Sequence, residues 1–165
     1  MSTIGKIELQ TDDEIDQALQ RTFNLLSYRL RSVKEIELYL KDKGYCDDVT
    51  CAVISRLHEL DYVNDLKFAE SYVRNEMKIS RKGPIVIRQM LQQKGVSSTD
   101  CDCALQLYPE SDQLENIIFH GEKLLRKYRH LHGFALSQKL NAALYRKGYS
   151  GDLIQQFLKQ EGIIT

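Results

Sequence analysis

Two clusters of basic side chains are the residues of this sequence best suited to binding chemistry. In the first cluster Arg74, Lys78 and Arg81 follow i, i+4, i+7 spacing, so a helix there would carry three cations on one face. Such a face suits phosphate groups or an acidic protein surface, and a solvated helix face is the alternative that the sequence leaves open. The second cluster begins at Lys123. The candidate binding residues of the two clusters are Arg74, Lys78, Arg81, Lys82, Arg88, Arg126, Lys127 and Arg129.

The four cysteines do not have the spacing of a metal site. Four residues separate Cys46 from Cys51, and one residue separates Cys101 from Cys103, and neither spacing is that of a common zinc site. The two pairs also stand at different positions of the repeat described below, so nothing brings them together. Reduced cysteines on helices are the simpler interpretation, and we predict no metal.

Motifs of catalysis and nucleotide binding are also missing from the sequence. There is no glycine-rich phosphate loop and no G-x-S-x-G nucleophile elbow. His130 and His132 form a two-residue motif that is too weak to indicate a metal. The paired carboxylates Asp12-Asp13 and Asp47-Asp48 stand where helix starts favour negative charge. We therefore predict no catalytic residue and no cofactor, and expect that the protein is not an enzyme.

Apolar residues at helical spacing indicate the elements that would carry the basic side chains. A stripe from Ile15 to Leu26 follows the period of a helix and shows none of the alternation of a strand. The segments 11–14 and 32–35 have the capping-box pattern of helix starts, and Gly44 is suited to end the second helix. Because no strand pattern or hairpin signal occurs elsewhere, we predict an all-α fold.

One short phrase, an apolar helical stripe followed by Lys-Gly and a further apolar residue, occurs three times. Its copies end in Lys43-Gly44-Tyr45, Lys94-Gly95-Val96 and Lys147-Gly148-Tyr149, about 50 residues apart. We predict a tandem array of three three-helix repeats, about nine helices in all, elongated and curved. Such an array forms a long surface that suits another macromolecule. The predicted divisions are an N-terminal tail at 1–10 and repeats at 11–62, 63–109 and 110–165.

The composition is that of an ordinary globular protein, and it narrows the range of possible binding partners. Of its 165 residues, 42% are hydrophobic and 28% are charged, and the formal net charge is zero, which argues against an indiscriminate binder of polyanions. The charge is uneven, since acidic residues predominate in residues 1–60 and basic ones in residues 111–165. The first ten residues lack the pattern of a secretory signal, and no apolar run is long enough to span a membrane, so we expect a cytoplasmic protein.

Three motifs, taken together, resemble the signatures of the RecX family of recombination regulators. The first runs from Arg31 to Tyr45 and carries the capping box and the first Lys-Gly. The second, Tyr62-Val63-Asn64-Asp65-x-x-Phe68-Ala69, is an aromatic, aliphatic and acidic step into a helix. The third runs from Gly83 to Val96. Their order and spacing agree with the family over roughly residues 15 to 160, although Asp61, Val86 and Met90 stand where the family usually has glycine, arginine and glutamate.

The resemblance implies a modulator, mainly an inhibitor, of the RecA recombinase. RecX-like proteins are tandem three-helix units that lie in the groove of the RecA–DNA filament and limit strand exchange, ATP hydrolysis and repressor coprotease activity during DNA repair and the SOS response. On this basis the basic candidates would contact the filament or its DNA. The repeat-junction motif of Tyr62, Asn64, Asp65 and Phe68 would be structural, with Phe68 packed and Asn64 or Asp65 capping a helix.

Two other kinds of function stay open at the level of the sequence. One is a helical module that binds DNA directly, which the zero net charge disfavours because phosphate-driven affinity scales with the number of cations at the backbone. The other is a scaffold protein with an unrelated partner. Weak DNA contact, directly or through the filament, no membrane association and a monomer are the remaining expectations.

Overall fold

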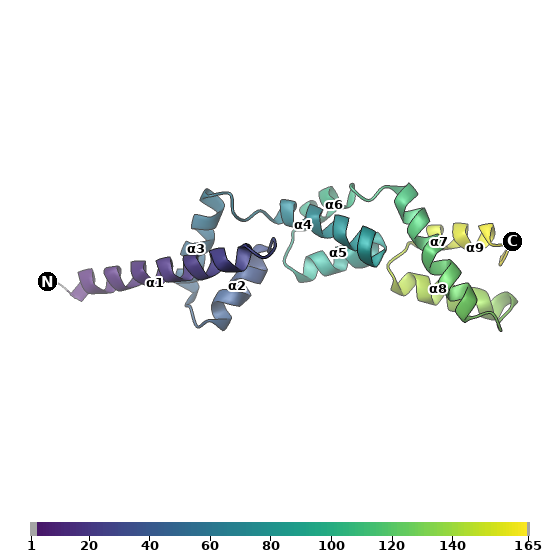
Figure 1. Cartoon of the computed structure of the whole chain (residues 1–165), viewed down its shortest axis with the longest axis horizontal. Helices are drawn as coiled ribbons and strands as arrows, with labels where there is room; N and C mark the ends of the chain where they lie inside the picture. The colour runs from purple at the N-terminus through teal and green to yellow at the C-terminus, as the bar shows by residue number, and fades with distance from the viewer. Residues whose placement is uncertain (1–2, 165) are drawn as a thin grey trace. The chain divides into compact units, whose positions relative to one another are not determined.

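Helices are the only regular secondary structure between residues 3 and 164, the part of the chain whose backbone the computed structural model describes; side chains are described from residue 12 to residue 164. The predicted all-α class is therefore confirmed, with no strand in that range (Figure 1). The α-helices are α1 (Thr3–Leu26), α2 (Val33–Asp42), α3 (Asp47–Glu59), α4 (Asp65–Asn75), α5 (Pro84–Gln93), α6 (Ser98–Leu105), α7 (Glu110–Lys127), α8 (Gly133–Arg146) and α9 (Gly151–Gln160), and one π-helical turn, η1 (Glu76–Ser80), follows α4.

Local sequence signals account for most helix ends. The predicted capping box before α2 is confirmed, because the Ser32 hydroxyl accepts the N–H of Glu35 at 3.2 Å while the Glu35 carboxylate accepts the N–H of Ser32 at 3.4 Å. Gly44 follows α2 with φ +89°, the left-handed conformation that glycine adopts most easily. Pro84 begins α5, where a missing N–H does no harm.

The predicted start of the first helix at Thr11 is wrong, because α1 begins at Thr3. Most of the segment predicted as an N-terminal tail is thus helical, and Met1 and Ser2 lie outside the described residues. A Thr-x-x-Glu pattern is also compatible with a helix interior, and residues 3–10 contain no proline to stop the helix. None of the described helices, α1 included, combines the length and the apolar character needed to cross a bilayer.

The chain divides into two compact units that do not coincide with the three predicted repeats. The first compact unit comprises Met1–Phe68 and Lys94–Ser97. In it α1 packs on α2 and α3, and the predicted apolar stripe of α1 supplies Ala18 and its neighbours to the core. The fully buried residues of this core include Ala18, Ile36, Leu40, Val53 and Leu57.

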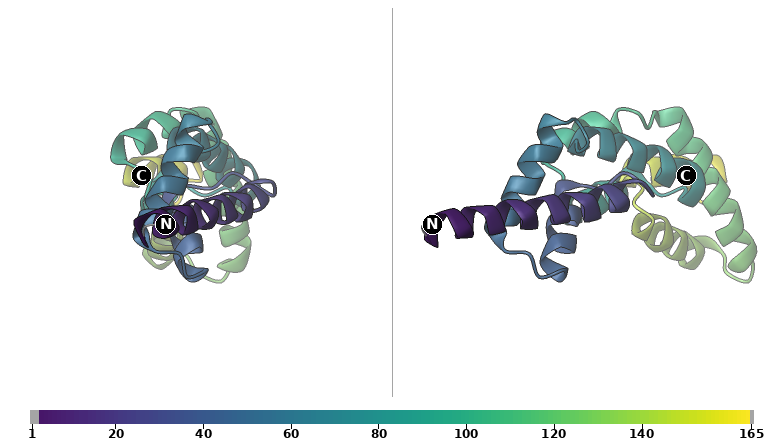
Figure 2. Two further views of the ribbon diagram at one scale, coloured as in Figure 1. Left: turned by 90° about the vertical axis from the view of Figure 1, so that its left-hand side faces the viewer. Right: turned by 60° about the vertical axis from the view of Figure 1, so that its left-hand side comes forward.

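The second compact unit comprises Ala69–Gln93 and Ser98–Thr165. Its main core lies where α7, α8 and α9 meet, the green and yellow helices of Figure 2. The buried aromatic side chains of this core are Tyr149 and Phe157, both 0% exposed. Most of the second repeat thus belongs to the same compact body as the third.

The repeated Lys-Gly turns join neighbouring repeats within each unit. In the first unit the hydroxyl of Ser32, at the start of α2, donates to the carbonyl of Lys94 at 2.7 Å. In the second unit the N–H of Gly83, at the start of α5, donates to the carbonyl of Lys147 at 2.8 Å. In both cases the carboxyl end of one helix, which has unpaired carbonyls, meets the amino end of another, which has unpaired donors. No heavy atom lies within 4 Å of a Cβ built on Gly44, the glycine of the first copy.

Glu35 is the electrostatic centre of the joint in the first unit. Its carboxylate pairs with Lys94 Nζ at 2.7 Å and with Arg29 at 3.0 Å, and only 16% of its side chain is exposed. Burial raises the pKa of Glu35, but the hydrogen bonds and charges of Arg29 and Lys94 outweigh this effect and bring the pKa down to about 2.

We therefore expect acid to loosen the first compact unit through Glu35. The folded carboxyl has a lower pKa than the unfolded one, so its stabilising contribution is complete above the ordinary value of 4.5 and is lost as the pH falls toward about 2. Glu35→Gln, which keeps a capping-box residue, should lower stability at pH 6 and flatten its dependence on pH below 5. Urea unfolding from pH 6 to pH 3 measures this, and an unchanged slope in Glu35→Gln would contradict it. Glu37→Gln, an exposed change on the same helix, is the control.

Candidate binding surface around Phe119

The π-helical turn η1 sets the position of the first basic cluster. After α4 the chain widens into η1 and then places Arg81 in the left-handed region, with φ 51°. Hydrogen bonding in a π-helix runs from i to i+5, so the regular spacing of a helical face is lost. The prediction that Arg74, Lys78 and Arg81 share one face is therefore wrong, because Arg81 lies beyond the end of the helix.

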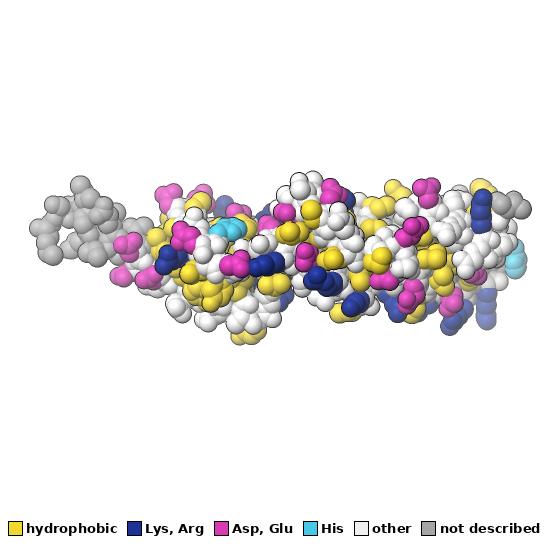
Figure 3. Space-filling view, turned by 90° about the horizontal axis from the view of Figure 1, so that it is seen from above, with side chains coloured by type: hydrophobic (Ala, Val, Ile, Leu, Met, Phe, Trp, Pro, Cys, Tyr) yellow, Lys and Arg dark blue, Asp and Glu magenta, His cyan; other side chains and the backbone are white. Residues whose placement is uncertain are grey.

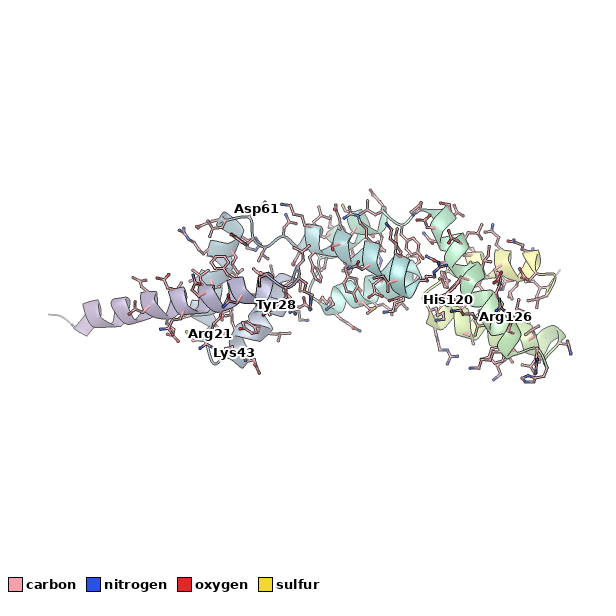
Figure 4. The ribbon with its side chains drawn as sticks, in the orientation of Figure 1. Arg21, Tyr28, Lys43, Asp61, His120 and Arg126 are labelled. Atoms are coloured by element: carbon pink, nitrogen blue, oxygen red, sulfur yellow. The ribbon has the colours of Figure 1, made fainter. Side chains whose placement is uncertain are left out.

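Side chains of the third repeat hold the Arg81 backbone in place. The hydroxyl of Tyr149 donates to the Arg81 carbonyl at 2.6 Å, and His120 Nε2 lies 2.9 Å from the same oxygen. Because a carbonyl oxygen only accepts, Nε2 is the protonated nitrogen of the neutral His120 ring. Figure 4 shows His120 on α7, and the residue is 9% exposed. Burial and the nearby charge of Lys147 lower the pKa of His120, although the bond to the Arg81 carbonyl opposes the shift.

A second buried group of polar atoms lies beside this carbonyl. Asn116 Nδ2 donates to the carbonyl of Met77 at 2.9 Å and to the hydroxyl of Tyr108 at 2.8 Å. Burial raises the pKa of Tyr108 and of Tyr149, so both stay neutral. Met77 near the start of η1 and Arg81 just after it are thus held by hydrogen bonds to residues 39 to 68 positions away in the sequence.

Two cations contact one aromatic ring at this place. The guanidinium of Arg81 lies 4.0 Å from the centroid of the Phe119 ring, and the ammonium of Lys123 also lies 4.0 Å from it. Both distances are well within the range of cation–π attraction. Glu115 lies 3.7 Å from Arg81, but its side chain is 76% exposed, and such a surface pair contributes about 0–1 kcal/mol. Arg81, Phe119 and Lys123 form what we call the Phe119 cluster.

Most of the other predicted binding residues are engaged with carboxylates of the chain itself. Arg74 pairs with Glu70 and Arg126 with Glu122, each one turn apart on a helix. Figure 3 shows this mixture, with dark blue and magenta side chains interspersed over the C-terminal part of the visible face. Lys127 lies 5.5 Å from the Tyr128 ring, and Lys78 and Arg129 are exposed. The remaining ion pairs of this set are Lys82 with Glu76 and Arg88 with Asp102.

The structure brings together residues that the sequence did not connect. Of the predicted candidates only Arg81 belongs to the Phe119 cluster, and Lys123 joins it from the second basic segment. Phe119 is not among the predicted residues. Its spacing of four residues from Lys123 on a helix is the one signal that could have indicated a contact.

The repeat-junction motif makes contacts within the first compact unit. Asn64 Oδ1 accepts the N–H of Lys67 at 2.9 Å and so caps α4, while Asp65 accepts the N–H of Val33 at 2.9 Å. Phe68 is 4% exposed. The Tyr62 ring packs edge-on against Phe23 with a centroid distance of 4.8 Å. The three contacts and the burial of Phe68 are compatible with a structural role, which stays a prediction.

Asp61, which Figure 4 labels after α3, occupies the place where the family usually has glycine. Its φ is 55°, so the position requires the left-handed conformation that glycine adopts without strain. Its carboxylate pairs with Lys67 at 2.8 Å. Asp61 therefore adopts a backbone conformation that a glycine would take more easily.

The cysteines show no sign of metal binding in the described part of the chain. Cys101 is buried and the other three are exposed, and no disulfide joins any of the four. Among residues whose side chains are described, no group of three or more His, Cys, Asp or Glu residues could hold a metal ion.

Comparison with known proteins decides the family. Family models for the first, second and third three-helix domains of RecX match residues 18–57, 64–105 and 110–158. The crystal structure of RecX from Lactobacillus salivarius superposes with a TM-score of 0.84 at 35% identity, covering 93% of this chain and 99% of that one. The chain belongs to the RecX family. A second crystal structure, of regulatory protein RecX, matches with a TM-score of 0.88 at 29% identity, covering 94% of this chain and 76% of that one.

Curated RecX relatives are longer than this chain. It is 38% identical to regulatory protein RecX of Bacillus subtilis (strain 168) and 36% identical to that of Bacillus pumilus (strain SAFR-032), in both cases over 93% of its own length. The match covers 58% and 59% of these relatives. This RecX chain therefore spans about three fifths of their length, and each of its three matched domains lies within one predicted repeat.

Proposed function

We propose that this chain modulates, mainly by inhibition, the RecA recombinase, and that it does so without catalysing a reaction. In this proposal it lies in the groove of the RecA–DNA filament in the cytoplasm and limits strand exchange, ATP hydrolysis and repressor coprotease activity. Membership of the RecX family supports the RecA recombinase as the partner. The Phe119 cluster is the observation that supports a charged contact.

The physics of the Phe119 cluster favours an anionic partner. Arg81 and Lys123 carry like charges on one ring, and the carboxylate that pairs with Arg81, that of Glu115, is exposed. A phosphate or carboxylate placed between them would relieve their repulsion and gain charge-assisted hydrogen bonds. The Arg81 backbone is already fixed by Tyr149 and His120, so little further ordering is needed on binding.

Titrating this protein into the ATPase reaction of the cognate RecA recombinase on single-stranded DNA, at fixed salt, tests the proposal. A fall in the rate at substoichiometric protein is expected, since one bound molecule would affect many filament subunits. No effect at stoichiometric excess would contradict it. Affinity for bare DNA with steep salt dependence would instead favour the direct DNA-binding alternative.

The contribution of the Phe119 cluster is tested by Arg81→Gln combined with Lys123→Gln. Each charge-assisted contact is worth about 1.5 kcal/mol or more, so the double variant should weaken filament binding by about 100-fold or more. The hydrogen bonds from Tyr149 and His120 are made to the backbone carbonyl of Arg81, so they do not need its side chain and should persist in the variant. Arg56→Gln combined with Lys67→Gln removes the same charge from the first compact unit and serves as the control. Equal binding of the two double variants would refute a role for the cluster.

A further inference from the structure

An open groove lies between α8 and α9 in the third repeat. It has a volume of about 560 Å³, within the range of about 300–1,000 Å³ that is typical of ligand sites. Its walls include Phe134, Ala142 and Tyr145 from α8, with Leu158 and Ile164 opposite. Phe134 is 80% exposed and Tyr145 is 62% exposed, so two large aromatic side chains stand in solvent at this groove.

The first repeat has an equivalent groove with a different character. It has a volume of about 440 Å³ and is lined by two acidic side chains, a lysine, a threonine and a cysteine, with Leu38 as its one large apolar residue. When the repeats are aligned on Lys43-Gly44 and Lys147-Gly148, four lining positions correspond. The corresponding pairs are Glu37 with Asn141, Leu38 with Ala142, Lys41 with Tyr145, and Cys51 with Gln155.

In the second repeat an ion pair spans the same place. Arg88 and Asp102 stand at the positions of Asn141 and Gln155, and their side chains pair with each other. The surface that is charged in the first repeat and bridged in the second is therefore uncharged and open in the third. Because the same place differs in each repeat, the open apolar groove of the third repeat is not imposed by the three-helix fold itself.

The charges around the third-repeat groove indicate the kind of partner. No lining residue is charged, so nothing in the groove would hold a phosphate, and its apolar walls suit side chains of a protein. On α8 the only charged residues are Lys139 and Arg146, both exposed and seven positions apart. On α9 the exposed Asp152 and Lys159 offset each other, so the two helices that form the groove carry a net positive charge. An apolar groove between two helices of net positive charge is complementary to an amphipathic segment with acidic residues beside its apolar face.

We propose that the α8–α9 groove docks an acidic amphipathic segment of a protein partner. Large apolar side chains of the segment would lie against Phe134 and Tyr145, and its carboxylates would face Lys139 and Arg146. Aromatic anchors of this kind commonly dominate binding energy at protein interfaces. The inference rests on the proposed function in taking the recombinase filament as the source of the segment, but it concerns a different surface from the Phe119 cluster.

Binding of Phe134→Ala combined with Tyr145→Ala to RecA filaments on oligo(dT) tests this docking site. Both side chains are exposed, so the double variant should keep its fold, and we expect its affinity to fall about 30-fold or more. Lys139→Glu combined with Arg146→Glu should also bind weakly, whereas Lys139→Arg combined with Arg146→Lys should bind like the unaltered protein. Leu38→Ala, an exposed apolar change in the equivalent groove of the first repeat, is the control.

The outcomes separate failure of this site from failure of the proposed function. If the unaltered protein does not bind filaments, the proposed function fails. If it binds and the Phe134 and Tyr145 double variant binds equally well, the docking site is overturned while the proposed function stands. A loss of affinity for bare oligo(dT) in the same variant would overturn a protein partner in favour of nucleic acid. A dimer in sedimentation that this variant dissociates would overturn the recombinase segment in favour of a second copy of the chain.

Discussion

Gly148→Ala should destabilise the second compact unit by about 2–5 kcal/mol. Gly148 has φ +92°, a conformation that costs an alanine about 1–2 kcal/mol. A Cβ added there would also lie 2.5 Å from the backbone N of Val86. Because backbone cannot rotate aside as a side chain does, the turn would move off α5 and lose its bonds to Gly83 and Ile85. Urea unfolding measures the loss, and hydrogen exchange by mass spectrometry should place it in the second unit.

Gly44→Ala is the matched control for this prediction. Gly44 occupies the same turn in the first repeat with nearly the same φ of +89°, but no heavy atom lies within 4 Å of an added Cβ. Only the conformational cost remains, so we expect a loss of about 1–2 kcal/mol. Similar losses for the two variants would show that the Lys147-Gly148 turn does not join the repeats through close backbone contact.

Asn116→Ala is expected to cost the second compact unit about 2–4 kcal/mol. Asn116 is 6% exposed and donates to both the Met77 carbonyl and the Tyr108 hydroxyl. Alanine would leave two buried polar groups without their donor, and this penalty exceeds the value of the bonds themselves. Because Met77 lies in η1, the change should also increase exchange of the η1 amides and loosen Arg81. We therefore expect weaker binding of filaments in addition to lower stability, with urea unfolding and filament titration as the two measurements.

Gln113→Ala provides the comparison on the same helix. The Gln113 amide donates to the backbone carbonyl of Tyr108 at 2.8 Å, and the residue is half-buried, so water replaces the lost donor. Its expected cost is below about 1 kcal/mol, with no effect on η1. If Asn116→Ala cost no more than Gln113→Ala, water would be able to reach the Met77 carbonyl, and the buried network would not position Arg81.

Local signals in the amino-acid sequence were enough to predict the helices, most of their ends and the family. The capping box at Ser32, the stop at Gly44 and the start at Pro84 depend on residues within one or two turns. The three copies of Lys-Gly indicated the repeats. The start of α1 was not predicted, because the capping pattern at Thr11 is equally compatible with the interior of a helix.

Contacts between segments that are distant in the sequence determine where the Lys-Gly turns pack and where the basic side chains lie. The residues of η1, from Glu76 to Ser80, predict a regular helix when they are considered alone. The η1 turn and Arg81 after it are nevertheless held by Tyr149, which lies 68 positions after Arg81, and by His120 and Asn116, each 39 positions from the residue that it binds. The Phe119 cluster likewise takes its two cations from segments about 40 residues apart. Packing and hydrogen bonding between such segments outweigh the local preference for a regular helix, and a pattern within a few residues contains no information about these partners.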